Sequence, residues 1–190
     1  MKTIRKLLSL MTLMVLWLLA SIILWGFVFN LITDTSPEWK ITLCVDAETP
    51  GNTRLAVAME EKLAGKTRMV KVRPFEYAMF DSGTLTGADL YIVPASHVET
   101  YLEWFAPVPE EMRGADGILA VNGVPMGIPA YDAKMKTGIA ADCIRYETPT
   151  QEAEDFYLFF GKASVHLAAN EKAVDNAALD AARCLLELYK

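Results

Sequence analysis

The stretch LLSLMTLMVLWLLASIILWGFVFNLI, residues Leu7–Ile32, decides how the chain is organised, because its 26 consecutive residues include no charged side chain. A helix that crosses the hydrocarbon core of a bilayer needs roughly 20 apolar residues. No face of the run is polar, which argues against a core helix of a soluble protein. A cleaved signal peptide is the other alternative, but its apolar region is usually about 7–15 residues long. We therefore expect a transmembrane signal-anchor helix.

The charges on either side of this helix predict its orientation. Lys2, Arg5 and Lys6 precede it, whereas Asp34 and Glu38 follow it. Positively charged flanks stay in the cytoplasm. We therefore expect a single-pass protein of the cell membrane with four parts: a cytoplasmic N-terminus at residues 1–6, the anchor at residues 7–32, a linker at residues 33–38 and an extracytoplasmic domain at residues 39–190.

Length and charge bound the part of the chain outside the membrane. Residues 33–190 suffice for one ordinary domain. The segment before residue 33 takes three of the 18 basic residues and none of the 24 acidic ones, which leaves 15 basic against 24 acidic residues, a formal charge of −9. Such a domain repels nucleic acid and anionic lipid headgroups. Small solutes, cations or a basic protein remain as partners.

The three cysteines, Cys44, Cys143 and Cys184, do not form a disulfide framework by number or spacing. Buried free thiols are expected, with one disulfide and one free thiol as the alternative. The sequence has no phosphate-binding loop, dinucleotide fingerprint, nucleophile elbow or zinc-protease motif. A dyad of Cys143 with His97 or His166 is disfavoured, because nothing marks Cys143 as activated. We therefore expect no enzyme, no metal and no cofactor.

Hydrophobic periodicity predicts strands and a helix in the first half of the domain. We expect strands at residues 39–46, 68–73 and 89–93. The third of these is almost wholly apolar, as a central parallel strand should be. A helix lies between the first two strands, because Leu55, Met59 and Leu63 recur on one face, and Asn52 or Thr53 is its expected cap. This strand–helix–strand order is the unit of a parallel sheet.

Turn and cap signals organise the second half. Ser96 and Glu99 match the capping box of a helix that ends before Pro107. Asn122-Gly123 predicts a hairpin, and Pro125 places its second strand near a sheet edge. Further elements are expected as a helical turn at residues 75–80, strands at residues 139–146 and 155–160, and a helix at residues 175–189 whose buried face includes Val174, Ala178, Ala181, Ala182, Leu185 and Leu186. The whole is an α/β domain of three layers with a mostly parallel sheet.

The polar residues that follow the expected strands define a candidate site. Ligands of open parallel sheets bind outside the carboxyl ends of the strands. Those ends, and the loop after the hairpin, predict a ligand-binding site formed by Asp46, Glu48, Ser96, His97, Tyr131 and Asp132. Asp46 and Glu48 have two further interpretations, an acid/base pair or turn residues that cap the next helix. His97 is alternatively a solvated residue of a helical turn.

The order of these segments resembles a known family. Residues 39–46 (WKITLCVD) and 88–96 (ADLYIVPAS) resemble the opening lobe of extracellular solute-binding proteins of ABC importers, which have the type II periplasmic-binding fold. Residues 127–131 (GIPAY) resemble the segment that re-enters that lobe. Residues 156–167 (FYLFFGKASVHL) are similar to a pattern in members from low-GC Gram-positive bacteria.

The resemblance implies a solute-binding protein in which Asp46, Glu48, Ser96 and Tyr131 stand at binding positions. It departs from the family in two respects. Only a short loop between Trp104 and Ile118 stands where a second lobe would be inserted, and the expected transmembrane helix replaces the lipid anchor that is usual in Gram-positive members. We therefore expect a one-lobed, membrane-anchored form that presents a small solute, such as a carbohydrate, to an ABC permease. The alternative is an interaction module that docks on another membrane or envelope protein and binds no solute.

Overall fold

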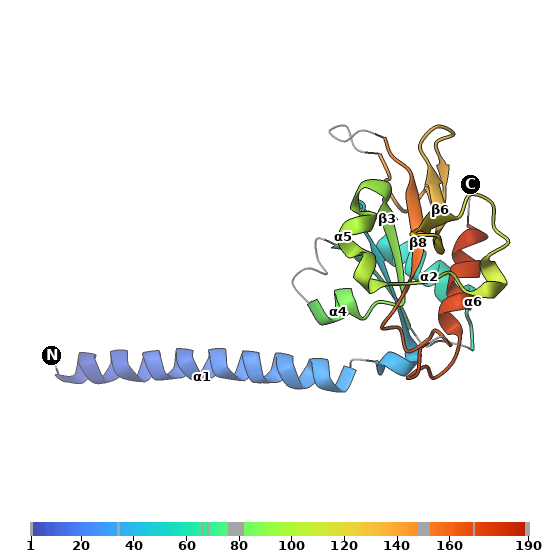
Figure 1. Ribbon diagram of the computed structural model, residues 1–190. Helices are drawn as coiled ribbons and strands as arrows, with labels where there is room; N and C mark the ends of the chain where they lie inside the picture. The colour runs from blue at the N-terminus through green and yellow to red at the C-terminus, as the bar shows by residue number, and fades with distance from the viewer. Residues whose placement is uncertain are drawn as a thin grey trace. The chain divides into compact units, whose positions relative to one another are not determined.

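The computed structural model describes residues 2–33, 35–65, 67, 69–75, 82–147, 153–168 and 170–188. The chain divides into two compact units, residues 1–35 and residues 36–190. The helical turn expected at residues 75–80 lies, apart from Phe75, outside the described residues. The elements of both units are labelled in Figure 1.

The first unit is one helix, α1 (Lys2–Thr33). Its segment Met11–Val28 has a mean hydropathy of 2.3, and none of that segment is buried. The side chains of Trp17 and Trp25 are 75 % and 71 % exposed. An exposed apolar surface of this length is stable in hydrocarbon and unfavourable in water. The expected apolar helix is therefore confirmed as one long enough to span a membrane, whereas its orientation stays a prediction.

The second unit is built on one sheet with the strand order β2-β1-β3-β8-β6-β5. Two short strands lie beside this path, β4 against β8 and β7 against β6. The bounds are β1 (Lys40–Val45), β2 (Met69–Pro74), β3 (Leu90–Pro94), β4 (Phe105–Ala106), β5 (Leu119–Val121), β6 (Val124–Asp132), β7 (Thr137–Gly138) and β8 (Phe156–Gly161). Among its described residues this unit has the α-helices α2 (Asn52–Lys62), α4 (Ser82–Thr86), α5 (Val98–Tyr101) and α6 (Ala177–Leu186).

One half of the sheet is parallel, as the strand–helix–strand pattern predicts. β1 pairs in parallel with β2 on one side and with β3 on the other. Helix α2 connects β1 to β2, and its residues Leu55, Met59 and the following Leu63 are buried. The expected cap is wrong, because Gly51 occupies the N-cap position and neither Asn52 nor Thr53 caps from that place. All of β3 is buried, as a central strand requires.

The other half of the sheet is antiparallel, so the expected mostly parallel sheet is not confirmed. β8 pairs antiparallel with both β3 and β6. The hairpin is confirmed, since Asn122 and Gly123 have φ values of 53° and 78°, as a type I′ turn requires. Its second strand β6 lies between β5 and β8 and is no edge strand. Pro125 is tolerated because it precedes Gly127, where the pairing of β6 with β8 begins.

The helices cover the sheet from two sides. Figure 1 shows α4 and α5 on one side and α2 and α6 on the other. The α2/α6 side holds the larger group of buried apolar residues, which includes Ile41, Leu43 and Leu185. The α4/α5 side holds a second group around Tyr91, Phe105 and Phe159. Every residue described in these two groups lies within residues 36–190, the second unit.

At two apolar segments the structure differs from what hydrophobic periodicity predicts. Residues 139–146 form turns and no strand, with Ala140 at φ 48° and its carbonyl accepting the N–H groups of Cys143 and Ile144. The segment is nevertheless apolar because its turns pack against the core, where Ile139 and Ile144 are buried. Helix α6 begins later than expected, at Ala177. Val174 therefore lies before the helix and is 57 % exposed, not buried.

The three cysteines are free and buried, as expected. Burial raises the pKa of Cys44 to about 12, despite the positive charge of Arg73 nearby. A thiol of that pKa is protonated at neutral pH, and thiols react as thiolates. Cys44 is therefore a core residue of β1.

A buried network of hydrogen bonds connects β1 and β3 at the end of the sheet opposite the candidate site. The Asp89 carboxylate accepts the Thr42 N–H at 2.8 Å and the Ser164 hydroxyl at 2.6 Å. Desolvation raises the pKa of Asp89, and these two hydrogen bonds oppose the rise. Both oxygens of this buried carboxylate have donors, so its burial is partly compensated. It thereby links β1, β3 and the loop after β8.

His166 extends this network to the start of the domain. Its ring is fully buried. Nδ1 lies 2.7 Å from Asp175 Oδ1, and Nε2 lies 2.8 Å from the carbonyl oxygen of Pro37. Both partners are acceptors, so both ring nitrogens must donate, and only the imidazolium ion can do so. Burial opposes that charge, but these hydrogen bonds and the Asp89 carboxylate outweigh it and raise the pKa of His166.

The raised pKa predicts how stability depends on pH. A His whose pKa is higher in the folded state contributes fully below the unfolded value of about 6.5, and that contribution is lost as pH rises through the folded value. We expect residues 36–190 to lose roughly 1–3 kcal/mol over that range. Urea unfolding at successive pH values measures this. The His166→Gln variant should lack this loss, and a variant with the same pH dependence as the natural protein would contradict the assignment.

Candidate functional site at the strand ends

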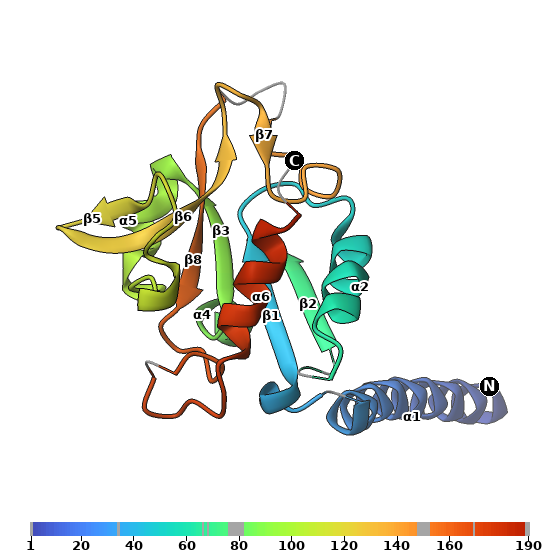
Figure 2. The same cartoon turned by 90° about the vertical axis from the view of Figure 1, so that its right-hand side faces the viewer.

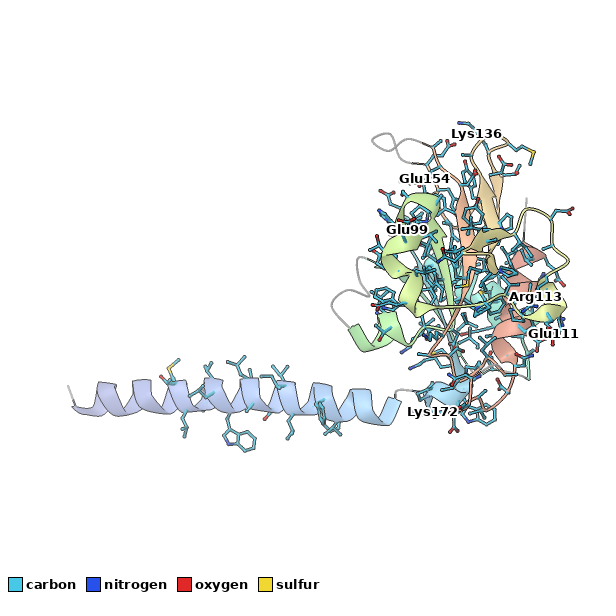
Figure 3. The ribbon with its side chains drawn as sticks, in the orientation of Figure 1. Glu99, Glu111, Arg113, Lys136, Glu154 and Lys172 are labelled. Atoms are coloured by element: carbon cyan, nitrogen blue, oxygen red, sulfur yellow. The ribbon has the colours of Figure 1, made fainter. Side chains whose placement is uncertain are left out.

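The six residues predicted to bind a ligand all follow or end strands at one end of the sheet. Asp46 and Glu48 follow β1, Ser96 and His97 follow β3, and Tyr131 and Asp132 end β6. β6 points the same way as β3, because both are antiparallel to β8 between them. Figure 3 shows Lys136 and Glu154 at this end, and Lys172 at the opposite end. All six residues therefore lie at the same end of the sheet, and of them Asp46 and His97 contact each other directly, whereas ligand binding stays a prediction.

Asp46 and His97 form the centre of the cluster. Asp46 Oδ2 lies 2.7 Å from His97 Nδ1, so the two strand ends are joined directly. The Asp46 side chain is 19 % exposed and that of His97 is 46 % exposed. The His97 ring packs edge-on against Tyr101. Desolvation, together with the nearby Asp46 carboxylate, raises the pKa of Tyr101 and keeps its hydroxyl protonated.

The capping box expected at Ser96 is wrong. The Ser96 N–H donates to Glu154 Oε2 at 3.0 Å, and Glu99 does not reach back to it. The segment begins as a 3₁₀ turn (Ala95–His97), continues as the short α5 and ends in a second 3₁₀ turn before β4. Contacts with distant residues, Glu154 to Ser96 and Asp46 to His97, thus replace the local cap.

Glu48 forms an ion pair with a residue that is distant in sequence. Its carboxylate lies 2.7 Å from Arg145 Nη1, and the Arg145 N–H donates to the Glu48 carbonyl. Both side chains are more than half exposed, so the pair adds little stability by itself. It serves to hold the loop after β1 against the turns that follow β7. No sequence pattern indicates this pair, because 97 residues separate its members.

Tyr131 and Asp132 have separate roles. The Tyr131 hydroxyl donates to Glu147 at 2.8 Å, and Lys136 lies 3.0 Å from the same carboxylate. Desolvation and the Glu147 hydrogen bond raise the pKa of Tyr131 to about 12. Tyr131 also stacks on Tyr146 with 4.5 Å between ring centroids. Asp132 Oδ1 accepts two backbone N–H groups of the next turn, so this carboxylate caps a turn.

Tyr157 and its acidic neighbours lie at this end of the sheet although they are not among the six predicted residues. Tyr157 lies in β8 opposite Val93 and Pro129, at the same end of the sheet, and its side chain is half-buried. Desolvation, followed by the charges of Asp155 and Asp132, raises its pKa. The sequence signal was available, because Tyr157 is the polar-tipped residue between the buried Phe156 and Leu158. Within the apolar strand expected at residues 155–160, however, a single tyrosine does not stand out.

The cluster can therefore offer carboxylate oxygens, phenolic hydroxyls and one imidazole to a ligand. Such a set suits hydroxyl-bearing or positively charged groups, which donate hydrogen bonds to carboxylates. In the part of the chain that the structure describes, no three His, Cys, Asp or Glu side chains come together as a metal site. Most of the predicted groups also have partners within the domain, so a ligand would share or replace those hydrogen bonds.

Comparison with known proteins adds little to this geometry. No protein-family model matches the chain, and no curated protein matches it. Among solved structures the chain is similar to thiaminase I from Bacillus thiaminolyticus, at 13 % identity and a TM-score of 0.34. The similarity covers 48 % of this chain and 28 % of that one. At that score the similarity supports neither the fold nor a function.

Proposed function

We propose that this protein is a membrane-anchored extracytoplasmic binding module, with a domain like one lobe of a type II periplasmic binding protein. In this proposal α1 is an uncleaved signal-anchor and helices cover both faces of the sheet as outer layers. The cluster around Asp46 and His97 recognises a small polar solute, such as a carbohydrate, which the module presents to an ABC permease. The resemblance of the strand sequences, and the absence of a second lobe between Trp104 and Ile118, support this assignment.

One observation carries the proposal. The 2.7 Å contact between Asp46 and His97 joins the ends of β1 and β3, and β6 ends at the same end of the sheet. Tyr101 and Tyr157 add hydroxyl groups whose raised pKa values keep them protonated, so each can donate as well as accept. Polar groups that converge from several elements are typical of a ligand site on this kind of sheet.

Thermal unfolding of residues 36–190 with sugars, amino acids, peptides and polyamines tests the proposal. A ligand at 100 times its Kd stabilises the folded state by about 2.7 kcal/mol, which raises the Tm of a domain of this size by roughly 5–11 °C. We expect a hit that the Asp46→Asn variant loses. The control is Asp116→Asn, at an exposed position distant in sequence from the six site residues. Loss of binding in both variants would contradict this site.

The hydrogen bonds that the site residues already make within the domain favour a second function. Glu48, Tyr131 and Ser96 all have hydrogen-bond partners within the domain. A surface whose groups are satisfied resembles the polar rim of a protein interface more than an empty ligand site. The same strand-end surface would then dock on a basic protein in the membrane or envelope. Affinity capture of the full chain from detergent-solubilised membranes, compared with an Asp46→Lys variant, distinguishes the two functions.

A further inference from the structure

A second concave site lies away from the strand-end cluster. β8 has two partners along the same edge: β6 pairs with Phe156–Phe159, whereas β4 pairs with Phe160 and Gly161. The first residues of β6 therefore leave the sheet and form an arm with β5. Figure 2 shows this hairpin extending to one side of the sheet. A groove of about 420 Å³ opens between the arm, β4 and the loop after β8.

The groove is apolar inside and polar only at its rim. Its floor consists of buried side chains, namely Phe105, Ala106, Met126 and Leu167. Leu102 and Val121 are half-buried walls, and Val124 at the mouth is 41 % exposed. The backbone closes one end, where the Val108 N–H donates to the Pro125 carbonyl at 2.8 Å. Small-molecule sites are of this size and are lined in this way, with few polar groups.

Lys162 supplies the charge at this rim. Its backbone is fixed, since its N–H donates to the Trp104 carbonyl at 2.8 Å, and its side chain is exposed. Among the residues that the structure describes, no carboxylate forms an ion pair with its ammonium group. Asn122 also lines the rim, on the hairpin turn, whereas the Asn170 amide is bonded to the Ser164 carbonyl. In a domain of net negative charge, one unpaired lysine beside an apolar groove is complementary to an amphipathic anion.

We infer that this groove binds a small amphipathic carboxylate, with its apolar part on Phe105 and Met126 and its carboxylate at Lys162. The apolar part is a short alkyl chain or one aromatic ring, given the volume of the groove. Burying that part provides most of the affinity, and the charge-assisted hydrogen bond to Lys162 selects acids over neutral analogues. The site is separate from the strand-end surface, because β4 pairs with the other end of β8.

Isothermal titration calorimetry of residues 36–190 with octanoate, 3-phenylpropanoate and octanamide tests the inference. We expect one or both acids to bind at least five-fold more tightly than octanamide, and the tighter acid shows whether a chain or a ring fits. Lys162→Gln should remove the preference for the acid, and Val124→Glu at the mouth should weaken both acids. Lys172→Gln, in an exposed loop outside the groove, and Asp46→Asn should leave acid binding unchanged.

Every outcome decides the inference. All four substitutions lie at exposed or partly exposed positions, so loss of folding is not expected to obscure the result. Absence of acid binding, equal binding of octanoate and octanamide, or acid binding that Lys162→Gln and Val124→Glu leave intact would each overturn it. Because Asp46→Asn reports on the strand-end site alone, failure here is distinguishable from failure of the proposed function.

Discussion

The Gly161→Ala variant of residues 36–190 is expected to be destabilised by about 3 kcal/mol or more. Gly161 ends β8, and its N–H donates to the Asp89 carbonyl at 2.8 Å. A Cβ at this position would overlap the carbonyl oxygen of Ala88 and lie 3.0 Å from the carbonyl carbon. Those atoms are backbone beside the central strand β3, and Ala88 is fully buried, so neither chain can move aside.

Urea unfolding measures this loss, which is a large part of the roughly 5–15 kcal/mol available to a domain. Gly114→Ala is the matched control, because nothing lies within 4 Å of a Cβ there and its φ lies outside the left-handed region. We expect that variant to unfold like the natural domain. Equal stability of the Gly161→Ala variant would show that β8 does not lie against Ala88 as described.

The double variant Leu18→Arg/Ile22→Arg is expected to release the protein from membranes. Both residues lie in the middle of the apolar segment of α1, and both are more than half exposed. An arginine at the centre of a membrane helix costs about 2.5–3.5 kcal/mol on the insertion scale, whereas Leu and Ile are favourable. Two such changes outweigh the apolar contribution of most of the helix.

Alkaline extraction of membranes from cells that express the full chain measures the effect. The natural protein should stay in the pellet at its full length, and the double variant should move to the supernatant. Leu18→Val/Ile22→Val is the control and should remain in the pellet. A shortened protein in the supernatant from cells expressing the natural sequence would show that α1 is removed as a signal peptide.

The parallel half of the fold was predictable because its signals are local. Alternating apolar residues in β1 and β2, and the fully apolar β3, each identify a strand without reference to the rest of the chain. The Asn122-Gly123 turn is equally local. By contrast, nothing in the sequence of residues 155–160 predicts that β8 lies between β3 and β6 and pairs antiparallel with both. Strand pairing depends on contacts between residues far apart in sequence, here Leu90 and Phe160.

The candidate site at the strand ends shows the same difference between local signals and long-range contacts. Strand direction alone predicted that Asp46, Ser96 and Tyr131 lie at one end of the sheet, and the structure places them there. It could not supply their partners, since Glu154, Arg145 and Glu147 come from distant segments. Local rules also misplaced the cap at Ser96, where a carboxylate from another loop satisfies the backbone N–H. Electrostatic partners are set by tertiary structure.

Amide NMR of residues 36–190, recorded while pools of sugars, amino acids and polyamines are added, tests the central claim most directly. We expect at least one pool to shift the amides beside Asp46, His97 and Tyr157 together, because these residues lie at the same end of the sheet. Shifts confined to the groove between the β5–β6 arm and β4, or no shifts with any pool, would contradict a solute site at the strand ends.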